Sequence, residues 1–266
     1  MVVADHGNHR IIQLKIGDTN GQVVAGGNSY GNRLDQLTFP TDVLIDKETD
    51  SLIICDYGNQ RVVRWYRRSN ITQGEILFNN ISCTGLAMDD QRYLYMFGTT
   101  DDEVRRYQIG DTNGIVVAGG NGQGDDLNQV QSPTYIFVDR EQTVYVSDNW
   151  NHRVMKWNKG AKEGIVVAGG QGGGNALTQL YNPNGLFIDD LGTVYVADTR
   201  NNRVMRWPKG ASHGTVIAGV NGYGAEASQL AWPIGLFFDQ HGNLYVADQG
   251  NHRVQRFSIE QTQNDD

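Results

Sequence analysis

The stretch Val194–Val204, which reads VYVADTRNNRV, decides the fold because close copies of it recur along the chain. Copies with the same strand–turn–strand pattern begin at Val144 and Leu244, at a spacing of 50 residues. The Asp-x-x-Asn-x-Arg turn at its centre also recurs at Asp5–Arg10 and Asp56–Arg61, and a degenerate copy follows the second of these. Six copies fill the 266-residue sequence, which indicates a repeat architecture.

Each full repeat reads as four short strands with turns between them. In the fifth copy the strands are predicted at 185–189, 193–198, 203–207 and 215–219. Turns of the Asp-x-x-Gly and Asn-Gly kinds are typical of β-hairpins, and the connections are too short for crossover helices. Each repeat is therefore predicted to be an antiparallel meander that buries its two faces by stacking on its neighbours.

These copies predict an all-β fold, a six-bladed β-propeller with four-stranded antiparallel blades. The first copy begins at its second strand and the last ends after its third, so the first and last blades are expected to be incomplete. We expect residues 1–266 to form a single propeller domain. The composition agrees, with 33 Gly, 5 Pro and no apolar run long enough to cross a bilayer.

The turns end in similar triplets: Asn8-His9-Arg10, Asn151-His152-Arg153 and Asn251-His252-Arg253. The repeat resembles the NHL repeat, which is named for Asn-His-Leu, although Arg stands here in the third position. The resemblance covers essentially the whole chain and implies the six-bladed propeller. It leaves the function open, because the family includes lyases, RNA-binding proteins and extracellular sensor domains.

An Asp and an Arg five positions apart recur in five copies. The degenerate third copy has lost both and carries Gly98 and Glu103 at these positions. Joint loss is expected of a buried ion pair, because removing one partner leaves the other charge uncompensated. We therefore predict five structural pairs: Asp5/Arg10, Asp56/Arg61, Asp148/Arg153, Asp198/Arg203 and Asp248/Arg253.

The Asp-x-x-Asn turns and the Gly-rich connections between blades are expected to share one face of the propeller. Non-repeated aromatic and polar residues concentrate in these segments, as they do in binding surfaces. The alternative is that individual aromatic side chains pack under the loops. We predict a non-catalytic scaffold that binds a protein or small-molecule ligand through this face, using Asp42, Tyr57, Tyr135, Trp150, Tyr181, Asn184, Arg200 and Trp232.

Two enzymatic alternatives use a metal ion in a propeller channel. The amidating lyases, which resemble this fold, place zinc-binding histidines after the repeated Pro, whereas this chain has Thr41, Thr134, Asn184 and Ile234 there. Calcium hydrolases of the paraoxonase or gluconolactonase kind need several converging carboxylates or amides, and only Asp42 and Asn184 qualify. No Ser-His-Asp or Cys-His set stands out, so we predict no catalytic residues, no metal and no cofactor.

RNA binding is a third alternative, because some NHL proteins read single-stranded RNA. Such sites need basic residues beside stacking aromatics. The loops of the predicted face offer eight acidic residues against Arg33 and Arg200, and the chain has a net charge of −8. We therefore expect no nucleic-acid or membrane partner, and a monomer as an isolated domain.

The two cysteines lie outside the repeat pattern. Cys55 and Cys83 are expected at the same end of neighbouring blades, so a disulfide is possible, but its demanding geometry favours two buried free thiols. The localisation is not fixed by the sequence. Two glycosylation sequons, Asn70-Ile-Thr72 and Asn80-Ile-Ser82, slightly favour an extracellular protein.

Overall fold

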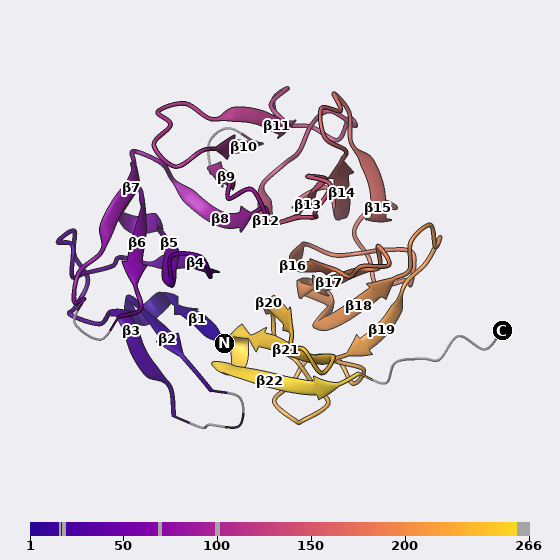
Figure 1. The fold of residues 1–266 in the computed structure, drawn as a ribbon. Helices are drawn as coiled ribbons and strands as arrows, with labels where there is room; N and C mark the ends of the chain where they lie inside the picture. The colour runs from indigo at the N-terminus through magenta and orange to yellow at the C-terminus, as the bar shows by residue number, and fades with distance from the viewer. Residues whose placement is uncertain (16, 18–19, 69–70, 99–101, 260–266) are drawn as a thin grey trace. The chain divides into compact units, whose positions relative to one another are not determined.

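The computed structural model describes residues 1–15, 17, 20–68, 71–98 and 102–259. Within these residues it has 22 strands, four 3-10 turns and no α-helix, and the strands form six antiparallel sheets (Figure 1). Four sheets have four strands, and the first and last have three. The predicted all-β, six-bladed propeller with incomplete first and last blades is confirmed. No helix of the described chain is long and apolar enough to span a membrane.

The chain divides into two compact units, Met1–Gly122 and Gln123–Asp266, and each unit holds three blades. The blades of unit 1 are β1 (Val2–Asp5), β2 (Arg10–Gln13) and β3 (Gln22–Gly26); β4 (Pro40–Asp46), β5 (Ser51–Asp56), β6 (Arg61–Tyr66) and β7 (Glu75–Asn79); and β8 (Cys83–Met88), β9 (Leu94–Gly98), β10 (Glu103–Tyr107) and β11 (Ile115–Gly119). Neighbouring strands in the sequence are neighbours in each sheet, as a meander requires.

Unit 2 repeats this arrangement in the fourth, fifth and sixth blades. Its strands are β12 (Pro133–Val138), β13 (Val144–Asp148), β14 (Arg153–Trp157) and β15 (Ile165–Gly169); β16 (Pro183–Ile188), β17 (Val194–Asp198), β18 (Arg203–Trp207) and β19 (Thr215–Ala218); and β20 (Pro233–Phe238), β21 (Asn243–Asp248) and β22 (Arg253–Ser258).

The strand register brings the repeated turn and the inter-blade loops to one edge of each blade. In the fifth blade Pro183 pairs with Asp198, and Asp198 pairs with Arg203. In the fourth blade Arg153 also pairs with Gly169, at the end of the last strand. We call this the turn edge, and the opposite edge, with the hairpins between strands one and two and between strands three and four, the hairpin edge.

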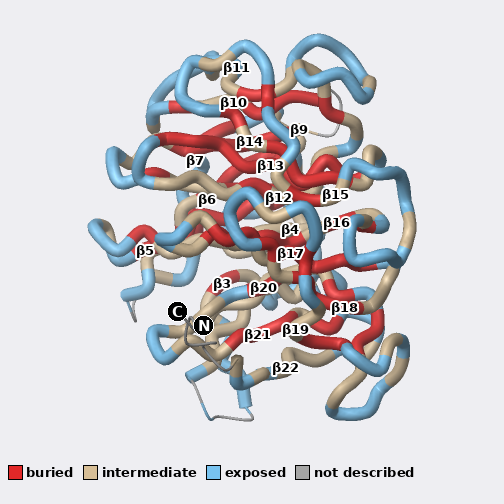
Figure 2. Tube along the Cα trace, turned by 90° about the vertical axis from the view of Figure 1, so that its right-hand side faces the viewer, coloured by how far each residue is buried: buried red, intermediate tan, exposed pale blue. Residues whose placement is uncertain are grey.

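The blades of each unit bury their apolar faces against one another. Trp207, Met205 and Val196 of the fifth blade cluster with Tyr145 and Val154 of the fourth, and equivalent clusters join the other neighbouring blades within each unit. Most buried residues lie on the strands, and most exposed residues lie in the loops and at the start of the last strand of a blade, as on β11 and β15 (Figure 2). Stacking of two-sided sheets thus supplies the core, as the repeat pattern predicts.

Candidate binding surface

The repeated Asp–Arg pair holds an inter-blade loop against its blade. In the fifth blade Arg203 Nε donates to Asp198 Oδ2 at 2.7 Å, and its two Nη atoms donate to the carbonyls of Asn175, Ala176 and Gln179. Asp198 in turn accepts the backbone N–H of Tyr181 at 2.7 Å. One buried ion pair therefore fixes both halves of the 170–182 loop, which frames the aromatic surface described below.

All five predicted pairs form the same Nε–Oδ2 contact, at 2.6–2.7 Å, but their burial differs. The pairs of the second, fourth and fifth blades are buried, whereas Arg10 and Arg253 are about one-third exposed. Burial raises the pKa of Asp148 and Asp198. Burial also tends to raise the pKa of Asp248, but hydrogen bonds from its neighbours, including Arg253, outweigh this effect and lower the pKa of that carboxyl.

Exposed aromatic side chains gather on the turn edge of unit 2. Trp150 is 63% exposed, Trp232 49% and Tyr181 44%. The backbone N–H of Trp150 donates to the Gln131 carbonyl, and the backbone N–H of Arg200 donates to the Tyr181 carbonyl. Residues of the turns and of the inter-blade loops therefore lie side by side. The Tyr181 ring packs edge-on against His152, with the ring centroids 5.2 Å apart.

A continuous series of contacts links these residues across the three blades. Asn182, beside Tyr181, donates to the side-chain oxygen of Asn149, beside Trp150, at 2.8 Å. Asn202, in the same turn as Arg200, accepts the backbone N–H of Trp232 at 3.0 Å. Trp232 also packs against the exposed ring of Tyr223. We call Trp150, Tyr181, Arg200, Tyr223 and Trp232 the aromatic strip.

Trp232 is held in a backbone conformation that a bulky residue rarely adopts. Its φ is 50°, in the left-handed region, and Pro233 follows it directly. Ser132 and Asn182 occupy the same place in the fourth and fifth blades with φ of 51°, and short polar residues of this kind tolerate such backbone better. A half-exposed Trp recovers little of this strain by burial within the chain.

Two other predicted binding residues of unit 2, Asn184 and Tyr135, contact other blades. Asn184 Nδ2 donates to Thr199 Oγ1 at 2.8 Å, and the Asn184 carbonyl accepts from Ser147 Oγ. Tyr135 is half-buried on β12, and its hydroxyl oxygen lies close to Gly235 of β20. Asn184 therefore links the fifth blade to the fourth, and Tyr135 reaches from the fourth blade to the sixth.

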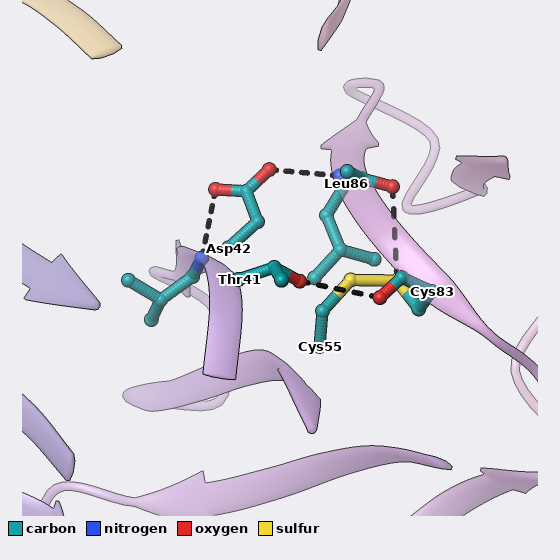
Figure 3. The surroundings of a disulfide bond; sticks show 7 residues. Thr41, Asp42, Cys55, Cys83 and Leu86 are labelled. Atoms are coloured by element: carbon teal, nitrogen blue, oxygen red, sulfur yellow. Dashed lines mark hydrogen bonds between the residues drawn. A yellow bond between two sulfur atoms is a disulfide. The ribbon is translucent and has the colours of Figure 1, made fainter. Parts of the chain in front are cut away.

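In unit 1, Asp42 bridges the second and third blades. One carboxylate oxygen accepts the N–H of Val43 and the other accepts the N–H of Leu86, both at 2.8 Å (Figure 3). Burial raises the pKa of Asp42 to about 6, although both hydrogen bonds favour the ionised form. Tyr57, also in unit 1, is half-buried at the start of its 3-10 turn.

The two cysteines form a disulfide, so the expectation of free thiols is wrong. Cys55 on β5 and Cys83 on β8 have Cα atoms 5.2 Å apart, within the range that a disulfide bridges, and both residues are buried. Thr41 Oγ1 donates to the Cys83 carbonyl beside the bond (Figure 3). Sequence spacing could not show that the two Cβ atoms face each other across the blade interface.

The histidines of the repeat have a structural use. Nδ1 of His9 accepts the backbone N–H of Phe39, and Nδ1 of His152 accepts that of Asn182. Each ring thus anchors the residue before the repeated Pro of the next blade. Within the described ranges, no three His, Cys, Asp or Glu side chains converge as a metal site requires.

Three features of the surface escaped the sequence-based predictions. Phe39 is 43% exposed at the position equivalent to Trp232, with φ of 49°, and only its place before the repeated Pro could have indicated it. Asn149 is buried and donates to the Pro183 carbonyl. A cavity along the third blade was also missed. The sequon at Asn70 lies outside the described residues.

Comparisons with known proteins agree with this fold. The family model for the NHL repeat matches residues 180–206 and 230–257. The matched segments lie in the fifth and sixth blades, and five of the six blades carry the same Asp-x-x-Asn-x-Arg turn, which is consistent with an NHL-repeat propeller. A search of curated protein sequences returned no match.

Several solved structures share the architecture at low sequence identity. An auxiliary nutrient binding protein from Bacteroides thetaiotaomicron matches at 16% identity and a TM-score of 0.72, over 95% of this chain and 64% of that one. A chain in a nidogen/laminin complex matches at 15% identity and 0.72, over 97% and 88%. A gluconolactonase from Xanthomonas campestris matches at 17% identity and 0.63, over 85% and 77%. These likenesses show the fold alone, and this chain spans about two-thirds of the nutrient-binding protein.

Proposed function

We propose that this propeller is a non-catalytic scaffold that binds a partner protein through the aromatic strip of unit 2. The observation that carries the proposal is the exposure of two Trp and two Tyr side chains along one edge, one of them, Trp232, at a strained backbone position. Interface energy concentrates in a few Trp, Tyr and Arg residues, and the strip contains all three types.

The surroundings of the strip favour a protein partner. The loops present Asp125, Asp126 and Glu226 near the strip, and Arg200 is its one fully charged cation. A surface with several acids and few bases repels nucleic acid, whereas aromatics within a polar rim are typical of protein interfaces. Among the structural neighbours, the chain in the nidogen/laminin complex is described as part of a protein assembly, which is compatible with this use of the fold.

The hairpin edge of unit 2 provides the internal comparison. Its most exposed apolar residue in the described chain is Leu191, at 79%, and its neighbours in the turn are Asp189, Asp190, Gly192 and Thr193. Leu191→Ala therefore removes exposed apolar area of similar size from the opposite edge. It controls for nonspecific loss of hydrophobic surface in any binding experiment.

Site-specific photocrosslinking tests the proposal. A benzophenone side chain placed at Arg200, within the strip, should capture a discrete protein partner that the same group at Leu191 does not capture. Trp150→Ala should reduce the yield from position 200 at least tenfold, as expected for a residue worth about 1.4 kcal/mol or more. Capture from position 191 alone, or a yield insensitive to Trp150→Ala, would place the partner elsewhere.

A further inference from the structure

A cavity of about 800 Å³ lies along the third blade, within unit 1, and is independent of the aromatic strip. Its polar wall comes from β9, β10 and the hairpin that follows β10. The lining residues that matter below are Ile81, Gly98, Glu103, Arg105, Tyr107 and Gly114. The short connection Asn80–Ser82 between β7 and β8 also lines the cavity.

In other blades a loop of the chain itself occupies the corresponding place. Long Gly-rich loops, 27–39, 120–132 and 170–182, lead into the second, fourth and fifth blades, whereas only Asn80–Ser82 lead into the third. In each of these long loops, a Leu carbonyl accepts a hydrogen bond from the backbone N–H of a hairpin glycine. These contacts are Leu34 to Gly74 at 2.7 Å, Leu127 to Gly164 at 2.7 Å and Leu177 to Gly214 at 2.9 Å.

The third blade differs at three positions beside the place that a loop occupies in other blades. At a spacing of 100 residues, Gly98 replaces the loop-binding Asp198, and Glu103 replaces the loop-binding Arg203. Arg105 replaces Met205, which is fully buried, and its side chain is 38% exposed. Gly114 is half-buried, whereas Gly74, Gly164 and Gly214 are buried.

The third blade keeps the donors that a loop requires, a guanidinium from a new position and an N–H from the repeated hairpin glycine. Arg105 Nε donates to Glu103, and its Nη1 donates to the Gly114 carbonyl at 3.0 Å, which holds the guanidinium in the cavity wall. The Gly114 N–H has no acceptor within the part of the chain that the structure describes. In the fifth blade, the Arg203 guanidinium and the Gly214 N–H donate hydrogen bonds to the inter-blade loop. The Arg105 guanidinium and the Gly114 N–H provide the same two kinds of donor in the third blade.

We propose that this cavity binds a peptide segment of a partner protein that takes the conformation of the missing loop. The pattern follows from the chain's own loops, which read NRLDQL at 32–37, DDLNQV at 125–130 and NALTQL at 175–180. The partner segment is thus Asn/Asp-x-Leu-x-Gln followed by Leu or Val. Its Leu carbonyl accepts from Gly114, its preceding carbonyls accept from Arg105, and its last apolar side chain lies on Ile81, Met96 and Phe97.

The disulfide fits this arrangement. Between the second and third blades the Cys55–Cys83 bond joins β5 to β8 directly, at the place where other blades rely on a loop clamped by an Asp–Arg pair. The covalent link stabilises the blade junction without the loop. The cavity can then stay open until a peptide enters it.

The probe is a fluorescein-labelled peptide, GGNALTQL, which copies residues 173–180 and is titrated with the whole chain by fluorescence polarisation. We expect saturable binding that weakens at least tenfold for GGNADTQL and for the Arg105→Ala variant. Arg106→Ala is the matched control, because Arg106 lies on the opposite face of β10, over the Tyr93 ring, and it should change the affinity less than twofold.

A loop graft separates loss of the site from loss of the fold. Replacing Asn80–Ser82 with the sequence of 170–182 should fill the cavity from within and abolish peptide binding, while the melting temperature stays the same or rises. Binding by the graft, equal binding of the Asp-substituted peptide, or no saturation at millimolar peptide would overturn the proposal. Occupation of the cavity by a glycan on Asn80, seen by mass spectrometry of the secreted protein together with absent peptide binding, would also overturn it.

Discussion

Replacement of Arg203 by Ala measures how much the repeated ion pair contributes to the propeller. The substitution removes the charged hydrogen bond to Asp198 and three bonds to loop carbonyls. The fully buried Asp198 carboxylate then keeps two donors, the backbone N–H of Tyr181 and the side-chain amide of Asn201. Removing one partner of a buried pair costs about 3–5 kcal/mol of unfolding free energy. We expect Arg203→Ala to fall in this range.

Two other arginines give graded controls. Arg10 makes the equivalent pair with Asp5, but it is about one-third exposed and no inter-blade loop accepts from it among the described residues, so Arg10→Ala should cost about 1 kcal/mol. Arg200 is an exposed turn residue, and Arg200→Ala should cost about 0.5 kcal/mol or less. The expected order of destabilisation is Arg203, Arg10, Arg200.

Denaturant unfolding followed by tryptophan fluorescence provides the assay, because Trp207 is buried on the same strand as Arg203. Hydrogen exchange supplies a local readout: the amides of 170–182 should lose protection in Arg203→Ala but keep it in Arg10→Ala. Equal shifts of the denaturation midpoint for the three variants would refute the argument that burial and loop contacts set the value of each pair.

Three further predictions concern the disulfide, Asp42 and catalysis. The disulfide closes a separation of 28 residues, so Cys55→Ala/Cys83→Ala should lower the unfolding free energy by about 3–4 kcal/mol; a change below about 1 kcal/mol would contradict the entropic estimate. Because the folded-state pKa of Asp42 is raised to about 6, the folded chain binds its proton more tightly than the unfolded chain, and stability should fall as the pH rises from about 4 to 6. That slope, worth at most about 3 kcal/mol, should vanish in Asp42→Asn, and an unchanged slope would show that another group carries it. Purified protein supplied with Ca²⁺ or Zn²⁺ should not hydrolyse gluconolactone above the uncatalysed rate, and metal-dependent turnover abolished by Asp42→Asn would overturn the non-catalytic proposal.

The sequence predicted the blades because the structural constraint recurs. An Asp-x-x-Asn-x-Arg turn that appears once would be an ordinary turn, but copies in five of the six blades mark the edge at which Asp198 and its equivalents organise a loop. The short apolar strands of each copy then predicted meanders that bury both faces against neighbouring blades. Even the incomplete first and last blades followed from where the copies begin and end.

The candidate site was harder to predict from the sequence, because its features depend on distances between residues of different blades. Asn184 and Asp42 looked like ligands beside the repeated Pro, yet the Asn184 carbonyl accepts a hydrogen bond from Ser147 of the fourth blade, and the Asp42 carboxylate accepts one from Leu86 of the third. The pairing of Cys55 with Cys83 depends on side-chain direction, which spacing does not encode. The cavity arises from a loop that is absent, and its signal in the sequence, the short connection before Cys83 together with Gly98 and Glu103, has meaning only beside the intact repeats.

The most direct test of the central claim is the affinity of the captured partner for three forms of the chain. Trp150→Ala/Trp232→Ala removes both indoles of the aromatic strip, and Leu191→Ala removes exposed apolar surface at the hairpin edge of the same unit. A partner bound through the strip should show a Kd at least 30-fold higher for the double variant, equivalent to about 2 kcal/mol, and an unchanged Kd for Leu191→Ala. An unchanged affinity for the double variant, with all three proteins equally folded by circular dichroism, would contradict the account.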